Sequence, residues 1–96
     1  MTIKVFKLIS GEELIAEVVD SREHEMTIEN PTTIMMQQTE RGVGVALVPY
    51  MPYAGKTVEL SRSAIASTGE PLVEMRNEYS RVVGSGIQIV SQGFQV

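Results

Sequence analysis

The sequence contains no cysteine and no tryptophan, and its only histidine is His24. Without cysteine the chain forms no disulfide and performs no thiol chemistry, which is compatible with a reducing compartment. One histidine without cysteine does not make a typical zinc site, and it completes no Ser-His-Asp or Cys-His set. We therefore expect no metal, no cofactor and no catalytic residue.

Long apolar runs are also missing. No stretch approaches the roughly 18 residues that a membrane helix needs, and no charged and then apolar leader opens the chain. We expect no membrane association and a cytoplasmic location. The net charge of −4 and a pI near 4.9 disfavour a non-specific nucleic-acid binder, because such binding depends on Lys and Arg neutralising phosphates. A local basic ring or a base-reading pocket remains compatible with this charge.

What is present indicates one small folded domain. The chain has 96 residues, of which 43% are hydrophobic and 21% are charged, as in ordinary globular domains. A chain of this length buries a modest core and is often stabilised by association. Aromatic residues make up only 5%, and six methionines fill part of their role.

Five segments have the alternating or β-branched pattern of strands. They are Ile3–Ile9, Leu14–Val19, Met26–Gln38, Val43–Tyr50 and Thr57–Ala66. Pro31 lies inside the third segment and predicts an edge, a bend or a bulge there, because proline cannot donate a ladder hydrogen bond. The segment Met51–Gly55, which holds Pro52, predicts a kink or turn.

The pattern changes near the C-terminus. Between Glu70 and Val83 apolar residues recur at steps of three and four, which predicts an amphipathic helix. Its expected apolar face consists of Leu72, Met75, Tyr79 and Val82. Pro71 fits an early helical position, and Gly84 fits the stop. The tail from Gly86 to Val96 either adds an edge strand or stays mobile. Short strands followed by one helix indicate a bent antiparallel sheet or open barrel with a helix appended.

Three stretches resemble the Sm-like superfamily, which includes the Lsm proteins and Hfq. In "ISGEELIAEV", Ile9, Gly11, Leu14, Ala16 and Val18 fill the positions of the first Sm motif, with Ala16 where the family usually has a second glycine. In "EMTIEN", a Met-Thr pair lies close to the Met-Asn that enters the third strand of the family. The stretch "LSRSAIAST" resembles the second Sm motif, with its Arg-Ser at the Arg-Gly corner. The resemblance covers residues 3–67 and is greatest to short Sm-like proteins of cyanophages and marine metagenomes.

The resemblance implies an all-β fold, a bent five-stranded antiparallel sheet or open barrel with an appended C-terminal helix. Residues 1–67 would form the Sm-like β domain, and residues 68–96 a helix and tail packed on it. In this family the strands beside the corner pair with the neighbouring subunit, which predicts a homo-oligomeric ring of about five to seven copies. The expected interface residues are Val58, Leu60, Ile65, Tyr50 and Tyr53. If the chain is encoded by a phage, its location would be the host cytoplasm.

The family also implies single-stranded RNA binding at the central opening of the ring. The candidate contacts are Arg62, Ser63, Ser61, His24, Met26 and Thr27. Arginine bonds and stacks on bases, although a turn arginine can equally be solvated or join an intersubunit ion pair. Members that bind uridine-rich RNA carry an Asp and an Asn near the third strand. Here Arg22 or Glu23 stands at the Asp position and Thr27 at the Asn position.

Two other classes of function remain beside RNA binding. A protein-only ring that acts as an assembly, scaffold or regulatory subunit fits the acidic balance and the missing Asp/Asn pair. An enzyme would need a general base, a nucleophile or a metal set, and the sequence supplies none of these. We therefore expect a protein without catalytic activity.

Overall fold

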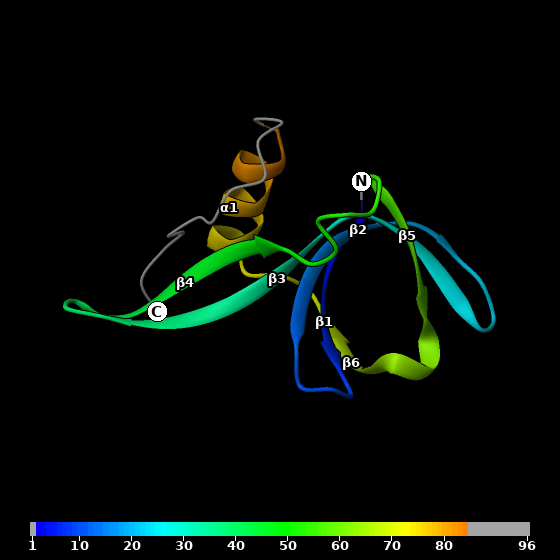
Figure 1. Ribbon diagram of the computed structural model, residues 1–96, viewed down its shortest axis with the longest axis horizontal. Coiled ribbons are helices and arrows are strands. Elements are labelled where there is room, and N and C mark those ends of the chain that lie inside the picture. The colour runs from blue at the N-terminus through cyan, green and yellow to red at the C-terminus, as the bar shows by residue number, and fades with distance from the viewer. Residues whose placement is uncertain (1, 85–96) are drawn as a thin grey trace.

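The computed structural model describes residues 2–84, which form one open antiparallel sheet and a C-terminal helix (Figure 1). Six strands are present in this part of the chain: β1 (Thr2–Leu8), β2 (Glu13–Ser21), β3 (Glu25–Thr39), β4 (Gly42–Pro49), β5 (Thr57–Ser61) and β6 (Ile65–Gly69). A single 3-10 turn, η1 (Arg62–Ala64), joins β5 to β6, and the helix α1 spans Val73–Gly84. The expected β-rich fold with an appended helix is confirmed.

The long strand β3 has two different partners on one of its edges. Its first part, Glu25–Glu29, pairs with β5, and its second part, Thr32–Thr39, pairs with β4. The other edge of β3 pairs with β2, and the order continues through β1 to β6. Strands β4 and β5 thus lie along the same edge of β3. The sheet has six strands rather than the expected five, because η1 divides the expected strand Thr57–Ala66 into β5 and β6.

The change of partner occurs at a bulge in β3. Asn30 has a positive φ of 50°, and the register with β2 shifts between Ile15 and Glu17. Pro31 follows, as the predicted bend requires. On the edge of β3 that faces β5, the Asn30 N–H donates to the carbonyl of Lys56 (2.9 Å), the residue before β5. These contacts hold the two halves of β3 at an angle.

Two hydrophobic cores lie on opposite faces of the sheet. The first fills the inside of the curled strands and contains Phe6, Leu8, Leu14, Ala16, Met26, Ile28, Val58 and Leu60. The second lies between the sheet and α1 and contains Ile3, Ile15, Val45, Leu47, Met75, Tyr79 and Val82. Strand β2 supplies residues to both, since successive side chains point to opposite faces. The helix thus packs on the outside of the curl (Figure 1).

The helix begins later than the spacing predicts. Its first residue is Val73, so Pro71 precedes the helix, and Gly84 is its last residue. Met75, Tyr79 and Val82 are buried as expected, but Leu72 is 67% exposed and does not belong to the apolar face. Leu72 lies one residue before the start of α1, so it is not part of the helical face that packs on the sheet.

The boundary between the expected β domain and the helix falls inside the last strand. Strand β6 continues to Gly69, past residue 67, before the chain turns into α1. The tail Gly86–Val96, for which an edge strand or mobility is expected, lies outside the described residues. None of the helical segments between residues 2 and 84 has the length and apolarity that crossing a membrane requires.

Candidate functional site

The predicted corner forms a tight exposed turn between β5 and β6. Ser61 and Ile65 keep extended backbone angles on either side of η1, and the Ile65 N–H closes the turn on the Arg62 carbonyl. The hydroxyls of Ser61 and Ser63 are hydrogen-bonded across the turn at 2.8 Å. This local bonding leaves the side chains of Arg62 and Ser63 on the surface.

The corner lies directly beside the turn that connects β2 to β3. The Arg62 N–H donates to the His24 carbonyl (2.9 Å), and Arg62 Nε donates to the Arg22 carbonyl. Arg62 Nη2 donates to Ser21 Oγ. Four of the six candidate RNA contacts, Ser61, Arg62, Ser63 and His24, therefore belong to one surface, which we call the corner surface. The His24 side chain is 88% exposed.

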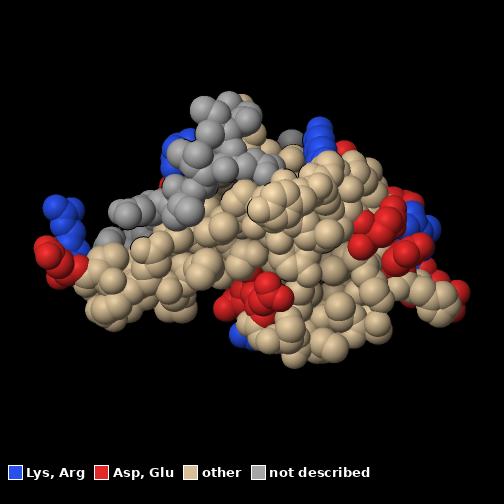
Figure 2. All heavy atoms as spheres, viewed as in Figure 1, with Lys and Arg blue, Asp and Glu red and all other residues tan. Residues whose placement is uncertain are grey.

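Acidic side chains surround Arg22 at this end of the molecule. Its guanidinium contacts Asp20 (2.9 Å), Glu25 (3.3 Å) and Glu59. Hydrogen bonds to Glu59 and then to Asp20 raise the pKa of Arg22. Red acidic and blue basic side chains gather where Figure 1 places the β2–β3 turn (Figure 2). The three acidic residues that contact Arg22, together with Glu23, supply four carboxylates around the corner surface, against the two arginines Arg22 and Arg62, so the corner surface and its surroundings carry an excess of negative charge.

The other two candidate RNA contacts are not free on this surface. Met26 is 6% exposed and packs in the first core beside Leu60, so its side chain is not available to stack on a base. Thr27 Oγ1 accepts a hydrogen bond from Arg22 (3.1 Å) and donates one to Glu59 (2.9 Å). Met26 therefore belongs to the core and Thr27 to the ion network around Arg22.

Sequence reasoning missed the roles of Ser21 and Glu59 in this site. Glu59 lies 37 positions from Arg22 and meets it because Thr27 on β3 pairs with Glu59 on β5. The alternation in β5 was a usable signal, since it places Glu59 on the outer face between Val58 and Leu60. The strand pairing itself depends on the bend of β3 and was not visible in the sequence.

The candidate interface residues divide into buried and exposed groups. Val58 and Leu60 point into the first core, where Ile65 and Tyr50 also pack, whereas the side chain of Tyr53 is fully exposed. What β5 offers to a neighbour is therefore its backbone edge. Among the described strands, β5 pairs only with β3 and β6 only with β1, so each has one unpartnered edge.

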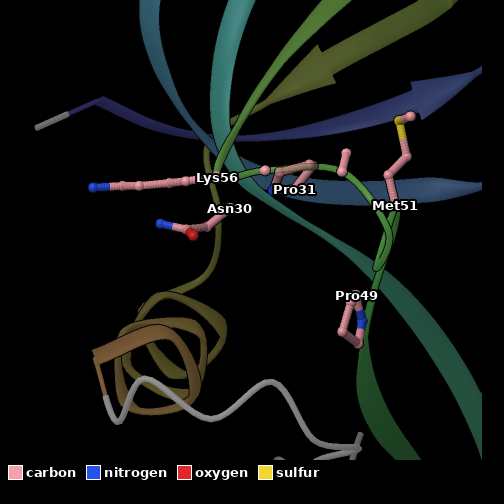
Figure 3. Close-up of a pocket in the computed structure, with 7 residues that line it drawn as sticks. Asn30, Pro31, Pro49, Met51 and Lys56 are labelled. Carbon is pink, nitrogen blue, oxygen red and sulfur yellow. The ribbon is translucent and has the colours of Figure 1, made fainter.

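A shallow cavity of about 200 Å³ opens where the chain passes from β4 to β5 (Figure 3). Its lining consists of Asn30, Pro31, Pro49, Met51, Ala54, Gly55 and Lys56. Asn30 and Lys56 point side by side, away from Met51. Lys56 Nζ lies 3.5 Å from a Glu29 carboxylate, so its charge is already offset. The residues that line this cavity include no nucleophile paired with a base.

Within residues 2–84, no three His, Cys, Asp or Glu side chains are grouped closely enough to hold a metal ion. The sequence matches no protein-family model, and no curated protein matches it.

Proposed function

We propose that this chain is an Sm-like assembly subunit whose copies join edge to edge into a closed ring of about five to seven subunits. The observation that carries the proposal is the pair of unpartnered edges on β5 and β6, on either side of the exposed η1 corner. The motif resemblance in residues 3–67 and the curled antiparallel sheet support the same assignment.

The physical reason for ring closure lies in the exposed strand edges. An unpaired edge presents a row of free N–H and C=O groups that invites uncontrolled pairing, and natural sheets cover or close such edges. If β5 of one copy pairs with β6 of the next, each copy contributes two different edges. The same contact then repeats head to tail from copy to copy until the last copy pairs with the first and the ring is closed. The small core of a 96-residue chain gains from this association.

A ring that binds protein rather than RNA fits the charges best. The corner surface carries more carboxylates than arginines, and Arg22 is already bound to three of them. RNA affinity depends chiefly on neutralising phosphates with free cations. We therefore propose an assembly, scaffold or regulatory subunit without catalysis as the main role.

Single-stranded RNA binding is the second candidate, and one observation favours it. The backbone hydrogen bond between Arg62 and His24 brings together two turns that each carry an exposed side chain, although the two residues lie 38 positions apart. Both side chains can stack on an unpaired base. This role needs the two side chains to outweigh the repulsion from the carboxylates around them.

The assembly test uses a short bismaleimide on cysteine variants, because the natural chain has no thiol. Thr57 on β5 and Ser67 on β6 are exposed. The double variant Thr57→Cys/Ser67→Cys should give a ladder of covalent oligomers, because every subunit links to two neighbours. Each single variant should stop at dimers or below. A double variant that gives no ladder contradicts the ring through these edges.

The RNA test is fluorescence anisotropy with labelled oligo-U and oligo-A at two salt concentrations. Arg62→Gln removes the corner cation, and Arg41→Gln at the exposed β3–β4 turn is the matched control. Saturable binding that weakens with salt and with Arg62→Gln, but not with Arg41→Gln, would support the RNA candidate. Absence of binding would leave the protein-only ring.

A further inference from the structure

Tyr53 lies on a tight turn between β4 and β5. The Ala54 N–H donates to the Met51 carbonyl (3.0 Å), which closes the turn around Pro52 and Tyr53. Proline at the second position of a turn fixes the backbone angle there. All four residues of the turn are exposed, and the side chain of Tyr53 is fully exposed. The turn therefore presents a phenol that no described residue of the chain covers.

Two backbone contacts with the bulge of β3 hold this turn in place. Before the turn, the Tyr50 N–H donates to the Pro31 carbonyl (3.0 Å). After the turn, the Lys56 carbonyl accepts from the Asn30 N–H (2.9 Å). The position of the Tyr53 backbone relative to the start of β5 is thus fixed. Tyrosine held in this way loses little conformational entropy on binding, and it is enriched among the residues that dominate the energy of interfaces.

An open apolar cavity of about 260 Å³ lies at another place, where β6 leads into α1. Val5, Ile34 and Met75 are buried or half-buried and form its floor. Glu70 and Leu72 are exposed and stand at its rim, with Leu72 67% exposed. Cavities that hold drug-sized ligands measure roughly 300–1,000 Å³, so this one fits a single large side chain better than a small molecule.

The charged groups at the cavity already have partners of opposite charge. Glu70 contacts Lys4 and Arg76, and Glu13, which also lines the cavity, lies 3.8 Å from Lys7. The site therefore does not need a charged occupant. A tyrosine suits it, because the ring is apolar and the hydroxyl can donate a hydrogen bond to a carboxylate at the rim.

The chain direction brings the turn of one copy to the cavity of the next. This step rests on the proposed ring, in which β5 of one copy pairs with β6 of its neighbour. Every strand pair of the described sheet is antiparallel, and β5 and β6 have five residues each. Full antiparallel pairing therefore sets Thr57, the first residue of β5, beside Gly69, the last residue of the neighbour's β6.

The distances along the chain are short enough for contact. Tyr53 precedes Thr57 by four residues, so their Cα atoms are at most about 14 Å apart. Gly69 itself lines the cavity, and Glu70 and Leu72 follow it directly. The turn that carries Tyr53 and the cavity thus lie at the same end of the paired strands.

We propose that Tyr53 of each copy inserts into the cavity at the β6–α1 connection of the neighbouring copy. The contact joins two different surfaces of the same chain, so it repeats head to tail in the same direction as the strand pairing. It covers the exposed phenol and the apolar floor of the cavity. Leu72 stays at the rim, where contacts add little to affinity.

The first test uses tryptophan fluorescence, because the natural chain has no tryptophan. Tyr53→Trp places a single reporter on the turn, and Arg41→Trp, at the exposed β3–β4 turn, is the control. We expect acrylamide to quench Tyr53→Trp about five times less than Arg41→Trp, because a close-packed site excludes the quencher. Light scattering on the same samples gives the assembly state. Equal quenching of the two variants in an assembled protein, or protection of Tyr53→Trp in a protein of monomer mass, would overturn the proposal.

A matched pair of second substitutions tests the cavity. Leu72 and Val73 are similarly exposed, at 67% and 68%, but Val73 does not line the cavity. An acidic residue at the start of a helix is favourable, so Leu72→Asp and Val73→Asp should both fold. In the Tyr53→Trp protein we expect Leu72→Asp to restore quenching and Val73→Asp to leave the protection unchanged. Equal effects of the two substitutions would contradict insertion at this cavity.

The third test measures association by light scattering over a dilution series. Tyr53→Ala should raise the dissociation constant of the assembly by about tenfold or more, and Tyr53→Phe, which keeps the aromatic ring, should raise it less. An unchanged constant in Tyr53→Ala would contradict the contact. The bismaleimide ladder of Thr57→Cys/Ser67→Cys reports on the strand edges separately. A ladder together with freely quenched Tyr53→Trp would overturn the Tyr53 contact and leave the ring, whereas loss of both would contradict the ring as well.

Discussion

The contact of Tyr79 with the bulge of β3 gives a sharp test of how the helix holds the sheet. The phenol is 3% exposed, and its hydroxyl donates to the carbonyl of Asn30 at 3.0 Å, with the Glu29 carbonyl at 3.2 Å. The Asn30 carbonyl also accepts from the Thr32 hydroxyl (3.0 Å), so it keeps one partner when the phenol is removed. We therefore expect Tyr79→Phe to lower the free energy of unfolding by about 1 kcal/mol at neutral pH.

The same residue predicts a pH dependence. Burial raises the pKa of Tyr79 in the folded protein, with nearby Glu17 and Glu29 adding to the shift. In the unfolded chain the phenol ionises near its usual pKa of about 10. Above that pH the unfolded state binds fewer protons than the folded state, so stability falls as pH rises. The contribution is present in full below pH 10 and is lost by about 1.4 kcal/mol per pH unit above it.

The assay is urea denaturation of the natural protein and of Tyr79→Phe between pH 8 and pH 11, at one protein concentration. The two proteins differ only at residue 79, so the difference between their free energies of unfolding isolates Tyr79. We expect the natural protein to lose its advantage over Tyr79→Phe above about pH 10. A difference that stays constant up to pH 11 would refute the burial of this phenol against the bulge.

Three further substitutions test the site and the fold. Arg62→Ala should lower the free energy of unfolding by less than about 1 kcal/mol, measured by thermal or urea unfolding, because the hydrogen bonds of Arg62 to Ser21 and Arg22 are at the surface. A larger loss would mean that Arg62 is needed for the fold of the corner. Asn30→Ala should be less stable than Asn30→Gly by about 1 kcal/mol, since φ is +50° there, and equal stability would contradict the bulge. Leu14→Ala should lower the free energy of unfolding by about 2–5 kcal/mol and Leu72→Ala should leave it nearly unchanged, because Leu14 is fully buried and Leu72 is exposed. Similar losses in both variants would mean that Leu72 is buried and that α1 begins before Val73.

Much of the fold was predictable from local patterns. Pro31 indicated the bend in β3, because proline cannot continue a ladder on both sides. Apolar residues at steps of three and four correctly gave Met75, Tyr79 and Val82 as the buried face of α1. The same pattern wrongly added Leu72, since spacing alone does not fix where a helix begins.

The arrangement of the site was only partly predictable. The corner and the β2–β3 turn were both selected, yet their contact through Arg62 and His24 depends on how far β3 bends. Met26 was taken as a surface contact, although it shares a strand face with the buried Ile28, and alternation alone would have assigned it to the core. The division of one β3 edge between β4 and β5 had no sequence signal, because long-range pairing is set by the bend rather than by local propensity.

Native mass spectrometry of the full chain tests the central proposal of edge-to-edge assembly most directly. If the β5 and β6 edges close a ring, the main species has a mass of about five to seven times the 10.6 kDa of one chain. The same mass should persist on dilution, because a closed ring has no free edges to lose. A species of 10.6 kDa throughout the micromolar range would contradict the assembly role.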